Sequence, residues 1–237
     1  TNNSIVNTNN RNTNNRNTNN RNTNNRNINN RNTNNRNTNN RSIKEHINDK
    51  NVLSLGVQFP PSKNEIITFQ KNFPEINFVC PQLATSPNEA ISQLERIIES
   101  SNSDNWFLIG SSLGGYFSTY LANKYRFLAV LINPAIKPFD LLEDYIGEQK
   151  NPYTNIVYQV TKQHMLDLKT IERNVPNFDD EQKNNYLVMV QTGDEVLDYQ
   201  QAVDKFQHCR LIKEQGGDHS FIGFDEKLPI IADFFQL

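Results

Sequence analysis

Sulfur is scarce in this chain of 237 residues, which has only two cysteines and two methionines. Cys80 and Cys209 each lie in or beside a short apolar run, and neither belongs to a Cys-x-x-Cys pair or to a cluster with histidine. This pattern excludes a disulfide framework and a cysteine-based metal site, and it is typical of reduced thiols in the cytoplasm. We therefore expect two free thiols and a cytoplasmic location.

Long hydrophobic runs are also missing. No segment approaches the roughly 18 apolar residues of a membrane-spanning helix, and the first residues, TNNSIVNTNN, lack the charged start and apolar core of a signal peptide. We therefore predict no membrane span. Because the chain begins with Thr1 in place of Met, we also expect the natural protein to start earlier.

Hydrophobic residues make up only 35% of the chain, and the cause lies in residues 1–42, which are almost entirely Asn, Thr and Arg. The pentapeptide NTNNR occurs seven times between Asn7 and Arg41, with one change to Ile28. Such repeats offer no apolar residues to a shared core, so nothing offsets the conformational entropy of ordering them. We predict a disordered tail over 1–42 and one globular domain over 43–237. Weak self-association and a basic arm for RNA or anionic lipid are the alternatives for the tail.

Basic residues are few outside these repeats. Seven of the 24 basic residues and none of the 26 acidic ones lie in residues 1–42, so the remainder has 17 basic and 26 acidic groups and a net charge of −9. Nucleic-acid binding needs clustered Lys and Arg to neutralise phosphates. We therefore expect no nucleic-acid partner.

The body alternates short apolar runs with amphipathic segments. Most of the runs are apolar throughout, as strands buried on both faces of a parallel sheet are. The predicted strands are 51–55, 76–80, 106–110, 127–133, 186–191 and 209–213, and the main predicted helices are 88–100, 113–125 and about 227–235. This alternation predicts an α/β fold with a doubly wound, mostly parallel sheet. The polar, proline-containing stretch 134–185 interrupts it, and we expect a small lid there, over the carboxyl edge of the sheet.

A candidate nucleophile lies in the sequence GSSLG, residues 110–114, between the strand 106–110 and the helix 113–125. A Gly-x-Ser-x-Gly sequence in this setting is typical of a nucleophile elbow, whose tight turn raises the central serine above the sheet edge. The sequence therefore predicts Ser112, rather than Ser111, as the nucleophile. The N-terminus of the following helix, with the N–H of Leu113, is expected to face a developing oxyanion.

A serine nucleophile needs a base, and in folds with this elbow the order along the chain is Ser, acid, His. His219 lies in the turn-rich loop QGGDHS between the last predicted strand and the last predicted helix. His164 lies in the interrupting stretch, and His208 lies near the end of a predicted helix. We predict His219 as the base.

The orienting acid is expected directly after the strand 186–191, where the chain reads TGDEVLD. Asp194 comes first and can reach a histidine in the next loop. Asp198 falls in the first turn of a predicted helix, where a carboxylate has a structural explanation. We favour Asp194 over Asp198, and both over Glu195. No nucleotide-binding or metal-binding motif is visible, so we expect no cofactor and no metal ion.

With these residues in place, the sequence resembles the YqiA-like esterase family of small bacterial α/β-hydrolases. The resemblance covers about residues 51–237, the body without the repeats. It is carried by IGSSLGGY (109–116), INPAIKPFDLLEDYIGEQKNPYT (132–154), QTGDEVLDYQQAV (191–203) and GGDHSFIGF (216–224), with PQL (81–83). It implies the α/β-hydrolase fold, Ser112, Asp194 and His219 as a catalytic triad, and hydrolysis of short acyl esters or thioesters.

One segment departs from the family pattern. Such esterases usually carry His-Gly-Phe after the first strand, and a backbone N–H there supplies half of the oxyanion hole, whereas this chain reads LGVQFPP at 55–61. We expect Gly56 to replace the family glycine and the N–H of Val57, or of Gln58, to serve as the second donor. Loss of one such donor typically lowers turnover by roughly 10²–10³.

Four residues in the matching segments are candidates for an acyl pocket and lid: Asn133, Pro134, Phe139 and Tyr153. Ordinary roles in turns and packing are the alternative. The sequence as a whole predicts a serine esterase that acts on a small-molecule ester or thioester through an acyl-enzyme. A non-catalytic binding or scaffold protein on the same fold, favoured by the altered loop, and acyl transfer to an acceptor other than water remain as alternatives.

Overall fold

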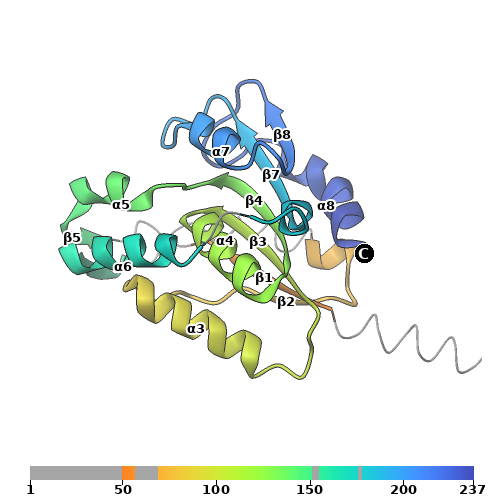
Figure 1. Cartoon of the computed structure of the whole chain (residues 1–237), viewed down its shortest axis with the longest axis horizontal. Helices are drawn as coiled ribbons and strands as arrows, with labels where there is room; N and C mark the ends of the chain where they lie inside the picture. The colour runs from red at the N-terminus through yellow and green to blue at the C-terminus, as the bar shows by residue number, and fades with distance from the viewer. Residues whose placement is uncertain (1–49, 57–68, 151–154, 176–177) are drawn as a thin grey trace, which may run out of the picture. The chain divides into compact units, whose positions relative to one another are not determined.

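A parallel sheet runs through the computed structural model, which describes residues 50–56, 69–150, 155–175 and 178–237 (Figure 1). Its strands have the order β2-β1-β3-β4-β7-β8, and every neighbouring pair is parallel. The strands are β1 (Asn51–Leu55), β2 (Asn77–Val79), β3 (Trp106–Ser112), β4 (Leu128–Pro134), β7 (Tyr186–Gln191) and β8 (Arg210–Glu214). The predicted parallel α/β sheet is confirmed.

The order of the strands reverses beside β1. The chain goes from β1 to β2 on one side, returns to β3 on the other side, and continues outward through β4, β7 and β8. In an open parallel sheet, ligands bind at the carboxyl ends of the strands next to such a reversal. Ser112 ends β3 and therefore lies at this point.

Helices cover both faces of the sheet. One face packs against α3 (Pro87–Glu99), α4 (Leu113–Tyr125), α6 (Lys162–Arg173) and α7 (Tyr199–Lys205), and the other packs against α8 (Leu228–Phe235). Strand residues alternate between the two: Val188 belongs to the first core cluster, whereas Leu187 and Met189 belong to the second. This double burial explains why the inner strands, such as β4 and β7, are largely apolar, whereas the edge strand β8 carries Arg210 and Glu214.

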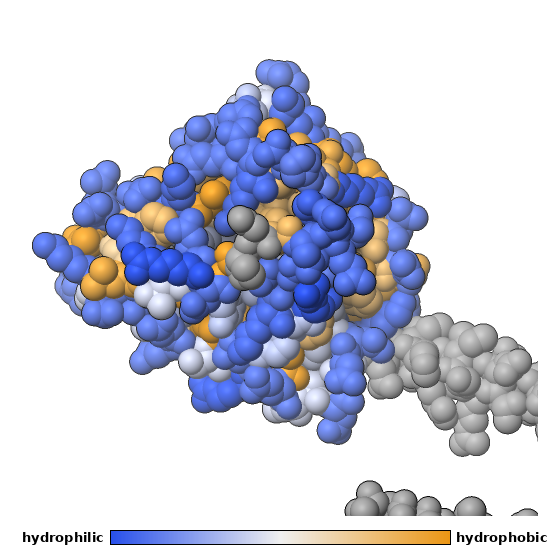
Figure 2. Space-filling model, viewed as in Figure 1, coloured by the Kyte–Doolittle hydropathy of each residue, from blue (hydrophilic) through white to orange (hydrophobic). Residues whose placement is uncertain are grey.

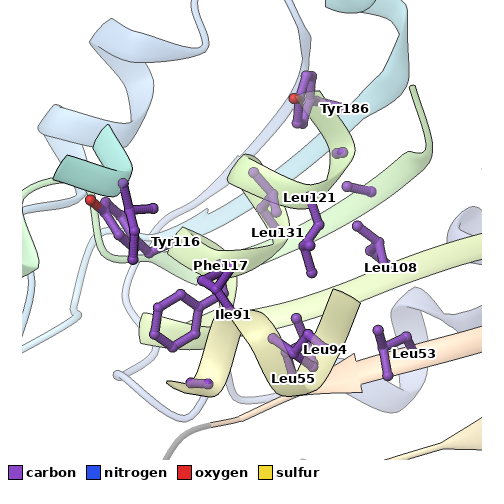
Figure 3. Close-up of a cluster of buried hydrophobic side chains, with 14 of the residues drawn as sticks. Leu53, Leu55, Ile91, Leu94, Leu108, Tyr116, Phe117, Leu121, Leu131 and Tyr186 are labelled. Carbon is purple, nitrogen blue, oxygen red and sulfur yellow. The ribbon is translucent and has the colours of Figure 1, made fainter. Parts of the chain in front are cut away.

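The larger core lies between the sheet and α3 and α4, where Figure 3 shows side chains from all three meeting. On α3, the buried residues Ala90, Ile91, Leu94 and Ile98 recur every three or four positions, so they share one helix face. They contact leucines of β1 and β3 that are almost completely buried. This packing fixes β3 and α4, the two elements that meet at Ser112.

The segment between β4 and β7 contains more structure than a lid alone. It includes α5 (Pro138–Leu141), the short 3-10 helices η1 (Leu142–Tyr145) and η2 (Gln182–Asn185), and α6. It also includes an antiparallel pair, β5 (Gly147–Lys150) with β6 (Val157–Val160). The hydroxyl of Tyr116, on α4, donates to the carbonyl of Leu168 at 2.5 Å, so α6 is joined to the helix that follows Ser112.

Several apolar side chains of this segment are exposed, which contrasts with the sheet. They are Leu141, Tyr145, Ile146, Ile156, Val157 and Leu166. Figure 2 shows hydrophobic atoms at the end of the molecule where Figure 1 draws β5, beside a surface that is otherwise mostly hydrophilic.

Both cysteines are free, as expected. Within the described ranges, no helix combines the length and the apolarity needed to cross a membrane. The short 3-10 helix η3 (Phe224–Lys227) leads directly into α8. The predicted tail, residues 1–42, lies outside the described residues, so the division of the chain into tail and domain stays a prediction.

Candidate active site

Ser112 has an unusual backbone conformation at the junction of β3 and α4. Its φ is 54° and its ψ is −124°, a region that non-glycine residues seldom adopt. The register between β3 and β4 shifts at this residue, whose carbonyl accepts from the N–H of Ala135 at 3.0 Å. The strained turn ends the strand and begins the helix within a single residue, which is the geometry expected of a nucleophile elbow.

The glycines around Ser112 allow the elements to come close. A Cβ at Gly114 would lie 1.9 Å from the carbonyl oxygen of Leu55, and a Cβ at Gly110 would lie 2.3 Å from Oγ of Ser118. Any side chain at Gly114 would therefore push the start of α4 away from the end of β1. The spacing in GSSLG reflects this close packing.

The imidazole of His219 lies between Ser112 and Asp194. Its Nε2 is 3.1 Å from Oγ of Ser112, and its Nδ1 is 2.9 Å and 3.0 Å from the two carboxylate oxygens of Asp194. The structure thus brings together three residues that the sequence predicts from distant segments. In this arrangement the ring can take a proton from the hydroxyl while the carboxylate holds the ring in place.

Asp194 is well placed to remain ionised. Its side chain is 1% exposed, and its Oδ1 accepts from the N–H groups of Val196 and Leu197, both at 2.9 Å. Burial by itself raises the pKa of this carboxyl, but the hydrogen bonds from His219, Leu197 and Val196 outweigh it, so the pKa lies below its ordinary value. A charged Asp194 can stabilise the imidazolium that forms when His219 accepts a proton.

The loops that carry Asp194 and His219 are joined by their backbones. The N–H of Gly193 donates to the carbonyl of Gly216 at 2.8 Å, and the N–H of Gly216 donates to Oγ1 of Thr192 at 2.9 Å. A Cβ at Gly193 would lie 2.3 Å from the carbonyl oxygen of Gly217. The two loops, TGD and QGGDH, therefore pack directly against each other, which fixes Asp194 close to His219.

The other candidate acids and bases lie outside the line from Ser112 to Asp194. Asp198 caps the N-terminus of α7 by accepting from the N–H of Gln200 at 3.0 Å. Glu195 accepts from the backbone N–H of His219 at 3.1 Å, so it contacts the loop rather than the ring. His164 lies in the first turn of α6, and His208 follows α7.

The two predicted oxyanion donors differ in what the structure describes. Leu113 is the first residue of α4, so its N–H has no acceptor within the helix. Val57 lies outside the described residues. The last described residue before it, Gly56, follows the end of β1, and its nitrogen would lie 3.1 Å from a Cβ at Gly114. The chain therefore leaves β1 next to the start of α4.

A cavity of about 200 Å³ lies beside this cluster. Its lining residues come from the end of β4, from α5 and from the loop after Asp194: Pro134, Ala135, Ile136, Lys137, Asp140, Leu141, Val196, Leu197, Asp198 and Gln201. Pro134 is the register partner of Ser112, and the N–H of Leu197 donates to Asp194, so two residues of the cavity wall adjoin the cluster. Ser112, His219 and Asp194 do not themselves line the cavity.

The four predicted pocket residues fall in different places. Pro134 lines the cavity, and Tyr153 lies outside the described residues. Phe139 is 7% exposed and belongs to the core, and Asn133 is 2% exposed, with its side chain in hydrogen bonds to the loop of His219. Neither of these two lines the cavity. The sequence did contain one signal for this cavity, because the two residues Val196 and Leu197, shortly after Asp194, are apolar.

Potential metal ligands are dispersed in the part of the chain that the structure describes. No group of three or more His, Cys, Asp and Glu side chains among these residues is arranged to hold a metal ion.

Known structures share the fold of this chain. A protein of Agrobacterium vitis S4 superposes with a TM-score of 0.61 at 16% identity, covering 80% of this chain and 89% of that one. Est1E from Butyrivibrio proteoclasticus, with ferulic acid bound, gives 0.56 at 11% identity, covering 79% and 88%. An esterase domain of a Rhodothermus marinus protein gives 0.55 at 15% identity, covering 79% and 86%. At these identities the likeness shows the fold.

The sequence itself matches a family model over residues 63–236, most of the chain, and the model is that of the uncharacterised protein family UPF0227. The match includes the segments that carry Ser112, Asp194 and His219. The chain has the α/β-hydrolase fold and belongs to this family, the YqiA-like esterase family.

Proposed function

We propose that the protein is a serine hydrolase that cleaves small acyl esters or thioesters. The observation that carries this proposal is the continuous line from Oγ of Ser112 through His219 to Asp194, with separations of 3.1 Å and 2.9 Å, at the carboxyl end of a strand in the α/β-hydrolase fold. A hydroxyl, an imidazole and a buried carboxylate in this order are the components of a nucleophilic triad.

The reaction follows from these positions. Nε2 of His219 takes the proton from Oγ of Ser112 as Oγ attacks the acyl carbonyl carbon, and the resulting oxyanion receives hydrogen bonds from the N–H of Leu113 and, as we propose, of Val57. The imidazolium then donates its proton to the leaving alcohol or thiol. Water enters, loses a proton to His219 and releases the acyl group from Ser112, which regains its proton.

The size of the cavity favours a small substrate. Pockets for drug-sized ligands have volumes of roughly 300–1,000 Å³, and this cavity, at about 200 Å³, lies below that range. Its wall combines apolar side chains, such as Leu141 and Leu197, with polar ones, such as Gln201. A short acyl chain fits such a space better than a long one.

Hydrolysis of p-nitrophenyl butyrate by the full chain tests the proposal. We expect turnover by the wild-type protein, none by Ser112→Ala, and wild-type turnover by the neighbouring Ser111→Ala. Equal rates for the wild type and Ser112→Ala contradict the proposal, because the release then comes from a contaminant or from surface groups. Absence of turnover in a folded wild-type protein favours a non-catalytic binding protein.

A further inference from the structure

The loop that carries His219 has little regular structure of its own. It connects β8 to η3, and four of its residues have positive φ: Gly216, Gly217, Phe221 and Gly223. A segment with such a backbone cannot extend a strand or a helix. Its position must therefore come from contacts with neighbouring elements.

Gln191, at the end of β7, supplies many of these contacts. Its Oε1 accepts from the N–H of Asp218 at 3.1 Å and of Ile222 at 2.9 Å, and its Nε2 donates to the carbonyl of Ile222 at 2.7 Å and to Glu214 at 3.0 Å. The amide group thus uses both lone pairs and both hydrogens. Three of the four bonds reach the loop backbone, on both sides of His219.

The packing around this amide is close. Gln191 is 3% exposed. A Cβ at Gly217 would lie 1.9 Å from its Oε1, so the loop backbone touches the side chain where glycine is present. Glu214, which accepts from the amide, also forms an ion pair with Lys227, the last residue of η3.

Asn133, near the end of β4, also bonds to the loop that carries His219. Its Nδ2 donates to the carbonyls of Asp218 at 3.0 Å and His219 at 3.2 Å, and its Oδ1 accepts from the N–H of Gln191 at 3.0 Å. Its φ is 39°, a conformation that asparagine tolerates better than most residues. One buried amide therefore joins two strands to the backbone of His219.

We propose that Asn133 and Gln191 are positioning residues, whose buried amides hold the His219 loop at the distance from Ser112 that proton transfer requires. The inference rests on the proposed function. Asp194 holds the Nδ1 side of the ring. The backbone of His219 bonds to Asn133 and Glu195, and Gln191 holds the loop backbone at Asp218 and Ile222, on either side of it. A displacement of about 1 Å at a reacting group can lower a rate by about 10²-fold.

The test compares Gln191→Met with Gln182→Met in the full chain. Gln182 is 5% exposed, and its amide bonds to the backbones of Asp179 and Asn123. Gln182 begins η2, directly before β7, and Gln191 is the last residue of β7. The control therefore removes an equally buried amide near the other end of the same strand.

We expect Gln191→Met to lower kcat per folded molecule for p-nitrophenyl butyrate by about 10²-fold with KM unchanged. Gln182→Met is expected to keep both kcat and KM. The folded fraction is measured by near-ultraviolet circular dichroism, so a loss of stability does not count as a loss of turnover.

Asn133→Gly is the second variant, because glycine keeps the positive φ while removing the amide. The same fall in kcat is expected. If Gln191→Met does not fold, Asn133→Gly alone tests whether the buried amides position His219. Wild-type kcat in a folded Asn133→Gly or Gln191→Met, or an equal fall in Gln182→Met, overturns the inference. An inactive wild-type protein overturns the proposed function instead.

Discussion

Ser112 can adopt its conformation because Gly110 and Gly114, two residues before and after it, allow the surrounding elements to pack closely. Its φ of 54° costs free energy in a residue with a side chain, and such conformations persist where the surrounding structure holds them. Here the glycines let β3, α4 and the end of β1 pack together, with 1.9 Å between a hypothetical Cβ at Gly114 and the carbonyl oxygen of Leu55. The packing of the core therefore stabilises a strained serine at the sheet edge.

Replacing Asp194 by Asn tests whether this carboxylate orients His219. The amide can keep the shape of the side chain, but it removes the negative charge and favours the wrong tautomer of His219. We expect Asp194→Asn to lower kcat by about 10⁴-fold in a folded protein. The measurement is steady-state hydrolysis of p-nitrophenyl butyrate.

The matched control for this prediction is Asp204→Asn. Asp204 is exposed on α7, where its carboxylate accepts from Gln200 at 2.7 Å. This variant is expected to keep the wild-type kcat. A fall of less than about tenfold in Asp194→Asn would assign the orienting role to another group, since triad acids contribute far more than that.

Some residues of the candidate site could be selected from the sequence, and others could not. Ser112, Asp194 and His219 each follow an apolar run or occupy a glycine-rich turn, in the order that the fold dictates. The hydrogen bonds of Asn133 to Gln191 and to His219 join residues 58 and 86 positions apart, and an amide in a strand has no pattern that reveals its partner. Only the folded chain brings these amides to the loop.

Among the elements, those of the sheet were predictable because their apolar runs are buried on two faces. The strand 51–55 and the helix 113–125 have the predicted bounds, and β4 begins one residue later than expected. Inside the stretch 134–185, the helix α6 was missed, although Met165, Leu168 and Ile171 recur every third position and are buried. Most other residues of this segment are polar, so the apolar periodicity is too weak to predict a helix from the sequence.

A prediction about α5 concerns the cavity. Leu141 ends this helix, lines the cavity and is 36% exposed, so a larger side chain there can occupy the cavity without disturbing the core. We expect Leu141→Trp to lower kcat/KM for p-nitrophenyl butyrate relative to the acetate by about tenfold or more, as changes of pocket volume by a few methylene groups do.

Leu166→Trp is the control for this change. Leu166 is 57% exposed on α6 and does not line the cavity. The ratio of the two substrates is expected to stay at its wild-type value in this variant. An unchanged ratio in Leu141→Trp as well contradicts the assignment of the cavity to the acyl chain.

For the whole molecule, the triad couples stability to pH. The pKa of Asp194 lies below its ordinary value of 3.8 in the folded state, because hydrogen bonds to His219 and two N–H groups outweigh burial. The unfolded chain therefore binds more protons than the folded one in the range below about pH 4, and the free energy of unfolding rises with pH there. The stability from this group is complete above that range and is lost as the pH falls through the folded pKa.

Urea unfolding at several pH values tests this coupling. The wild type is expected to lose unfolding free energy relative to Asp194→Asn as the pH falls below about 4, where the carboxyl of the unfolded chain takes up a proton. A difference that is the same at every pH down to about 2 contradicts the lowered pKa.

Active-site labelling is the most direct test of whether Ser112 is an activated nucleophile. Only a serine whose proton is taken by a neighbouring base reacts quickly with a fluorophosphonate. We predict a single adduct on Ser112, located by peptide mass spectrometry, which is absent from Ser112→Ala and from the denatured wild-type chain. No adduct in the folded wild type, or an adduct that also forms after denaturation, would contradict the assignment of Ser112, His219 and Asp194 as a catalytic triad.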